Sequence, residues 1–273
     1  MPLTFLNGGA PNYSGQTFTT ANALIDFIET TLVTAGWVSV SKVVGTSVFL
    51  RGTSQTNNHN CWVEFIYDNV SYLHVRGWLQ EAKTNGSTLN TSLGTGTFCR
   101  VAVGTENRLW ITANSDAGCI CIMPNSVPAF GIHFGFLDRI EPTDQWAWMV
   151  GTITSGTGTA YSAKSKFDAA NWRWIGTDAG AQHGVYDAIW MNDSNGRRNY
   201  DGACLMRPFF WLEGRASGNS TSTFPNSPYF RGNVQYAYTG MASTSAGTFG
   251  TDPTSGFRFM SVGDSGWQAM RIA

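Results

Sequence analysis

Between Trp37 and Met123 the sequence is a series of short runs in which apolar and polar residues alternate, and this pattern constrains the fold more than any other feature. Gly, Asn and Ser separate the runs, as expected for tight turns. Because successive side chains of a strand point to opposite faces, such runs predict consecutive antiparallel strands with one buried face. The runs are WVSVSKVVG, SVFLRG, CWVEFIYD, SYLHVRGWL, FCRVAVG and RLWITAN.

One amphipathic helix is predicted before these runs, in the segment TTANALIDFIETTLVTAGW. Thr19 or Thr20 is suited to the N-cap, and Gly36 is suited to ending the helix. The apolar residues that recur at helical spacing are Leu24, Ile25, Phe27, Ile28 and Leu32. We expect the stripe of Leu24, Ile28 and Leu32 to pack on a sheet of four to six strands.

Further strands are expected in the second half of the chain. The segment from Pro128 to Ile153 predicts a strand, a turn at Glu141-Pro142-Thr143-Asp144, and a return strand rich in aromatic residues. The runs HGVYDAIWMND, CLMRPFFWLEG, YFRGNVQYAYTG, GFRFMSVGD and WQAMRIA then form a second set, with Ser/Thr/Gly/Asn-rich loops at 214–228 and 240–256.

Together these patterns predict an α+β fold that is predominantly antiparallel β, with one N-terminal amphipathic helix packed on a sheet and a β-sandwich-like C-terminal half. We expect an N-terminal arm over residues 1–18, a helix plus antiparallel sheet over 19–150, a flexible connection over 151–166, and a second β-rich part over 167–273. The two β-rich parts are expected to pack together as one compact unit.

The charge of the chain argues against several classes of partner. Only 13% of the residues are charged, against roughly 25% in an average soluble domain, and the net charge is −1. We therefore expect no nucleic-acid partner. A continuous apolar run long enough to span a membrane is lacking, and the start MPLTFLNGGAPNYSG does not resemble a secretory signal. The expectation is a protein made in a cytoplasm, with no membrane partner and a surface largely covered by neighbouring proteins.

Two of the five cysteines, Cys119 and Cys121, lie two residues apart in the segment RLWITANSDAGCICIMP, which predicts a strand, a polar turn and a second strand. On a strand these thiols and Met123 share one face, and Ile120 and Ile122 share the other. A buried structural row, a disulfide within or between subunits, and a metal site are the three interpretations. The cysteines open to an intersubunit disulfide or interface role are Cys61, Cys99, Cys119, Cys121 and Cys204.

Four tryptophans form two alternating pairs, Trp146 with Trp148 and Trp172 with Trp174. Each pair is expected on one face of a strand, as part of a core, of a subunit interface, or of a platform for sugar rings.

No residues are predicted to act as a catalytic, cofactor-binding or metal site. The run Gly263-Asp264-Ser265-Gly266 contains the residues found around the nucleophile of chymotrypsin-like proteases, but too little chain follows it to complete the barrel that such a site needs. A hairpin turn is the interpretation that we favour, and we expect a protein that is not an enzyme and needs no cofactor.

Taken in order, the features resemble a family of virion structural proteins of tailed bacteriophages, particularly those with contractile tails. The segments that carry the resemblance are the early helix ending in Ala35-Gly36-Trp37 with the following SVFLRG, RLWITANSDAGCICIM, GIHFGFLDRIEPTDQWAWMVG over 131–151, and GFRFMSVGDSGWQAMRIA at the end. The likeness follows the chain in order but is low in identity, and the Cys119/Cys121 strand and the loops near 214–256 depart from it.

This resemblance implies a virion component assembled in the host bacterial cytoplasm, at the head–tail neck or collar or elsewhere in the tail. It implies a homo-oligomeric ring, for which six- or twelve-fold symmetry is expected, with other phage neck and tail proteins as partners. The alternative function is a receptor- or glycan-binding module at the tail tip.

Overall fold

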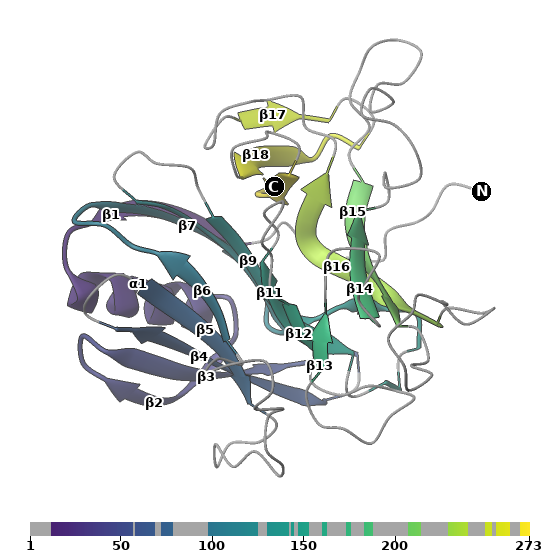
Figure 1. Cartoon of the computed structure of the whole chain (residues 1–273), viewed down its shortest axis with the longest axis horizontal. Helices are drawn as coiled ribbons and strands as arrows, with labels where there is room; N and C mark the ends of the chain where they lie inside the picture. The colour runs from purple at the N-terminus through teal and green to yellow at the C-terminus, as the bar shows by residue number, and fades with distance from the viewer. Residues whose placement is uncertain are drawn as a thin grey trace.

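The structure is a computed structural model of the 273-residue chain. It describes residues 12–56, 58–68, 72–78, 98–124, 130–141, 143–144, 147–152, 160–162, 173–175, 183–187, 207–213, 229–239, 249–252, 255–262 and 268–273. This part of the chain contains three antiparallel sheets and one helix, which confirms the predicted α+β, β-rich fold class (Figure 1).

Sheet B contains five consecutive strands in the order β2-β3-β4-β5-β6, which correspond to the first five of the six alternating runs; the sixth run, RLWITAN, belongs to another sheet. The inward side chains of sheet B, among them Val48, Val63, Phe65 and Val75, are fully buried. The strands are β2 (Val38–Val43), β3 (Ser47–Thr53), β4 (Asn60–Tyr67), β5 (Tyr72–Trp78) and β6 (Phe98–Ala102).

Helix α1 (Ala21–Thr34) begins and ends as the sequence predicts. The hydroxyl of Thr20, the N-cap, accepts a hydrogen bond from the backbone N–H of Ala23 at 3.3 Å. At the other end, Gly36 has φ +104°, and the N–H groups of Gly36 and Trp37 donate to the carbonyls of Val33 and Leu32. These two hydrogen bonds form a Schellman motif, which turns the chain from the helix directly into β2.

Sheet A has the strand order β1-β7-β8-β9-β11-β12-β13. The hairpin of β7 and β8 is the one predicted around Cys119 and Cys121, and β9 pairs with β11 across the predicted turn. The strands are β1 (Asn12–Phe18), β7 (Asn107–Ala113), β8 (Ala117–Pro124), β9 (Phe130–Phe136), β11 (Trp148–Thr152), β12 (Ala160–Ser162) and β13 (Arg173–Ile175).

Sheet C has the order β14-β15-β16-β19-β18-β17, and β10 pairs with β16 beside this path. Five of its strands fall in the five runs predicted for the second half. Its strands are β10 (Asp138–Arg139), β14 (His183–Asp187), β15 (Arg207–Glu213), β16 (Tyr229–Thr239), β17 (Phe249–Thr251), β18 (Arg258–Val262) and β19 (Gln268–Arg271).

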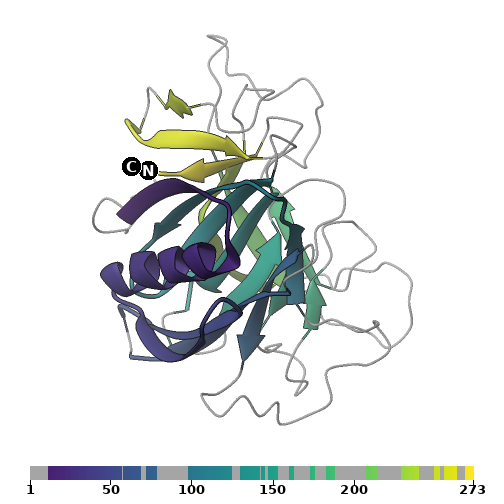
Figure 2. The ribbon, with the colours of Figure 1, turned by 90° about the vertical axis from the view of Figure 1, so that its left-hand side faces the viewer.

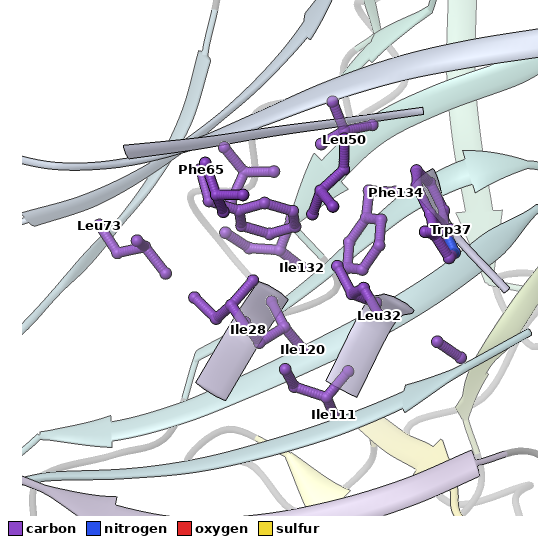
Figure 3. Packing of buried hydrophobic residues seen from close by; sticks show 14 of the residues in the cluster. Ile28, Leu32, Trp37, Leu50, Phe65, Leu73, Ile111, Ile120, Ile132 and Phe134 are labelled. Carbon is purple, nitrogen blue, oxygen red and sulfur yellow. The ribbon is translucent and has the colours of Figure 1, made fainter. Parts of the chain in front are cut away.

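Sheet A is the middle layer, and each of its faces forms a separate core. On one face, Ile120 and Ile132 pack with the inner side of sheet B and with Ile28 of α1. On the other face, Cys119 and Met149 pack against sheet C. Figure 2 shows α1 beside the sheets, between β1 above it and sheet B below it. Figure 3 shows Ile28 and Leu32 among side chains from both sheets of the first core.

Parts of the predicted organisation fall outside the described residues. Of the expected arm over 1–18, the structure describes residues 12–18, which form β1 and pair with β7 of the same chain. Within 151–166 it describes the end of β11 and strand β12. Residues 214–228 and most of 240–256 lie outside the described part.

Candidate functional site

A polar junction connects sheet C to the middle of sheet A through Gln235 of β16. Its side-chain Nε2 donates to the carbonyl of Phe136 at 3.1 Å, and its Oε1 accepts from Nδ2 of Asn114 at 3.2 Å. Its backbone carbonyl accepts from Nδ1 of His133 at 3.0 Å. One residue of sheet C therefore bonds to β9 at two places and to the β7–β8 turn at a third.

A register shift along β16 brings Gln235 to this position. β15 pairs with two stretches of β16, Tyr229–Asn233 and Tyr238–Thr239, which are separated by a register shift, and the second stretch also pairs with β19 on its other side. Between the two stretches Tyr236 has φ +62°, a conformation that costs energy for a residue with a large side chain. The three hydrogen bonds of Gln235 and the burial of Tyr236, which is only 8% exposed, stabilise this bend.

The β7–β8 turn, Asn114-Ser115-Asp116, extends the junction to sheet B. Oδ1 of Asn114 accepts from the N–H groups of Asp116 and Ala117, which closes the turn. The carbonyl of Asn114 accepts from Nε1 of Trp37 at 2.7 Å, and Oδ2 of Asp116 accepts from the N–H of Gln55 at 3.2 Å. The turn thus forms hydrogen bonds on both sides of the β2–β3 hairpin of sheet B, with Trp37 before it and with Gln55 after it.

The close approach of β9 to this turn requires a glycine. Gly135 has φ +98°, and a Cβ at this position would lie 2.3 Å from the carbonyl oxygen of Asp116. The same carbonyl accepts from the N–H of Phe136 at 2.9 Å. A side chain at Gly135 would therefore separate the two strands where Asp116 enters the interior.

Arg139 of β10 forms the outer part of the junction. Its guanidinium donates to the hydroxyls of Ser54 and Thr56 and, at 2.9 Å, to the carbonyl of Asp144, while it lies 4.7 Å from the ring centre of Phe136. Burial lowers the pKa of Arg139, and the carboxylates of Asp116 and Asp144 counteract this effect. Burial also raises the pKa of Asp116. The guanidinium of Arg139 and the carboxylate of Asp116 both connect loops that belong to different sheets.

The chemistry of the junction favours a structural role. Sγ of Cys61 donates to the carbonyl of Asp116 at 3.8 Å, and burial raises the thiol pKa well above its usual value, so Cys61 is no thiolate nucleophile at neutral pH. Among the described residues, no group of three or more His, Cys, Asp and Glu side chains is arranged to hold a metal ion.

The structure confirms the predicted sides of the β8 strand. Cys119, Cys121 and Met123 belong to the core against sheet C, and Ile120 and Ile122 belong to the core around α1. Cys61, Cys99, Cys119 and Cys121 are all buried in the structure, each with 0% exposure. Their burial favours the interpretation as core residues, because a fully buried thiol presents no surface to a neighbouring subunit. Cys204 lies outside the described residues.

Of the four tryptophans, Trp148 and Trp174 fall within the described residues. Trp148 is fully buried in the core around α1, so it packs within the subunit. Trp174 lies on β13 opposite Tyr161, and the structure describes only its backbone. Trp146, Trp172 and the turn Gly263–Gly266 lie outside the described residues.

The residues of the junction were not predicted from the sequence. The one usable signal is the turn sequence Asn-Ser-Asp, since Asn and Asp close turns with their own side chains. No local pattern marks His133 or Gln235 as partners, because each looks like an ordinary polar residue in an alternating run.

Comparison with known protein families and with curated proteins gives no match to this chain. None of the helical residues in the described part forms a segment long and apolar enough to cross a membrane.

Proposed function

We propose that this chain is a structural component of a tailed-phage virion and that it forms a homo-oligomeric ring. The place that we propose is the head–tail neck or collar, or another position in the tail. The ordered resemblance of the sequence to phage structural proteins supports this proposal, and so does the use of the buried polar groups at the junction to connect three sheets into one block.

The observation that carries the proposal is an exposed apolar edge on sheet B. β2 is the outermost strand of this sheet, and Val43 and Val44, at its end, are 58% and 74% exposed. Val38 on β2 and Val33 on α1 are also exposed. A sheet edge offers unpaired backbone groups, and apolar side chains along it favour contact with another protein. A ring subunit needs such surfaces on its flanks.

A receptor- or glycan-binding module at a tail tip is the alternative function. Burial of Trp148 removes one of the four side chains on which that alternative was based.

Cryo-electron microscopy of virions of the phage that encodes the chain, with mass spectrometry of the same particles, tests the proposal. We expect the chain among the particle proteins and density for its three sheets, repeated around the tail axis. Particles without this chain would contradict the proposal. Density for isolated copies at the tail tip would favour the alternative.

A further inference from the structure

Three polar side chains form a row across the middle sheet, on its face toward sheet C. Thr112 of β7 pairs with Cys119 of β8, and Cys119 pairs with His133 of β9. Cys119 belongs to the core between sheets A and C, and residues paired across neighbouring strands share a face. Thr112 and His133 therefore point into the same core. Each of the three residues has 0% exposure.

One ring nitrogen of His133 has no hydrogen-bond partner in the chain. Nδ1 donates to the backbone carbonyl of Gln235, because a carbonyl oxygen can only accept. Burial lowers the pKa of His133 to about 4, so the imidazole is neutral at pH 7 and its other nitrogen, Nε2, carries a lone pair. This atom is buried and no protein group donates to it. The imidazole therefore presents a hydrogen-bond acceptor to the core.

The hydroxyl of Thr112 has the same property at the other end of the row. Its Oγ1 is buried and has no hydrogen-bond partner in the chain. A hydroxyl can donate one hydrogen bond as well as accept, so it complements the acceptor on His133. Buried polar atoms without any partner are rare in folded proteins, and internal water molecules commonly satisfy those that protein groups do not reach.

The surroundings of His133 on sheet A are small. Gly151 of β11 pairs with His133 on the side away from β8, and Gly131, two residues before His133, pairs with Cys121. Neither glycine places a side chain beside the imidazole. On the β8 side lies the thiol of Cys119, which is small and is a weak donor and acceptor. A water molecule in this row would therefore have the two to four polar neighbours that internal water needs.

We propose that one internal water molecule binds in this row, where it donates a hydrogen bond to Nε2 of His133 and accepts one from Oγ1 of Thr112. Residues two strands apart in a sheet are separated by roughly 9.5 Å at Cα, and these two side chains form no direct hydrogen bond. The water joins β7 to β9 across Cys119. This inference concerns the core of one subunit, and it is independent of the proposed function.

A crystal structure of the full chain at neutral pH and high resolution tests the proposal. We expect one ordered peak within about 3.2 Å of both Nε2 of His133 and Oγ1 of Thr112. The peak should be lost in Thr112→Val, which replaces the hydroxyl by a methyl group, and kept in Thr112→Ser, which retains the hydroxyl. A wild-type core without the peak, or a peak that Thr112→Val leaves unchanged, would overturn the proposal.

Denaturant unfolding gives an independent measurement. If water satisfies the hydroxyl, Thr112→Val leaves the water without one partner, and we expect the folding equilibrium constant to fall by about fivefold. If the hydroxyl has no partner, the same change removes an unsatisfied polar group and raises the constant. Thr17→Val is the control, because Thr17 is exposed on β1 and should change the constant by less than about threefold. An unchanged or increased constant for Thr112→Val overturns the proposal.

Discussion

Nδ1 of His133, in the middle sheet, donates a hydrogen bond to the backbone carbonyl of Gln235, in sheet C, at 3.0 Å. His133 is fully buried, and burial lowers its pKa from the ordinary 6.5 to about 4. The imidazole is therefore neutral in the folded chain at pH 7, and the bond to Gln235 fixes the proton on Nδ1.

Acid should destabilise the fold through His133. Between pH 6.5 and pH 4 the unfolded chain binds a proton at this residue and the folded chain does not, so the free energy of unfolding falls as the pH falls through this window. The full effect is about 3 kcal/mol. Denaturant unfolding of the wild type and of His133→Asn at several pH values measures it. Asn can still donate to the Gln235 carbonyl, and we expect this variant to lose most of the pH dependence. An equal slope in both proteins would contradict the assignment.

Removal of the Gln235 side chain should loosen sheet C from sheet A. Gln235→Ala leaves the carbonyl of Phe136 and Nδ2 of Asn114 without this partner, and we expect the free energy of unfolding to fall by about 1–3 kcal/mol. Chemical denaturation measures the loss. Gln16→Ala is the control, because Gln16 is exposed on β1 and should change stability by less than about 0.5 kcal/mol. Equal losses in the two variants would contradict the role of Gln235.

The buried thiols should be unreactive until the chain unfolds. Burial raises the pKa of Cys61, Cys119 and Cys121, and the thiolate is the form that reacts. In a Cys204→Ser background, we expect a disulfide reagent to modify no thiol of the native protein within minutes and four in denaturant. Mass spectrometry of the labelled peptides identifies the sites. Rapid native labelling of Cys119 or Cys121 would contradict their place between sheets A and C.

A methyl group added at Gly118 should clash with the ring of Phe134 in the core. Gly118 pairs with Phe134 across β8 and β9, and a Cβ would lie 2.5 Å from Cζ of that ring. We expect Gly118→Ala to reduce the free energy of unfolding by about 1–3 kcal/mol. In a Phe134→Leu background the same change should cost less, because the ring atom is gone. A double-mutant cycle measures the difference, and additive effects would exclude the contact.

Local sequence patterns were sufficient to predict most strands and to predict which side chains of β8 lie on which face of the sheet. Period two alone places Cys119 and Ile120 on opposite faces, and the structure confirms it. Strands β1, β12 and β17 were not predicted. β1 has the sequence NYSGQTF, which lacks apolar alternation, and its pairing depends on β7, far along the chain.

The junction could not be predicted for a related reason. The burial of His133 and the partial burial of Gln235 are properties of the contact between two sheets, and the sequence around each residue is compatible with an exposed polar side chain. Even the bend in β16 depends on a register shift in its pairing with β15 rather than on a local turn signal, because Tyr236 is not a residue that usually adopts positive φ.

The pairing of β1 with β7 has a consequence for how the chain acquires its structure. Asn12 pairs with Ala113, so β1, which is synthesised well before β7, cannot form its ladder until the β7 segment has been synthesised. Contacts between distant segments form slowly, because a long loop must close first. Until then the apolar face of α1, with Ile28 and Leu32, has only sheet B to cover it. Nascent chains ending before residue 107 should therefore be the species most prone to aggregate during synthesis.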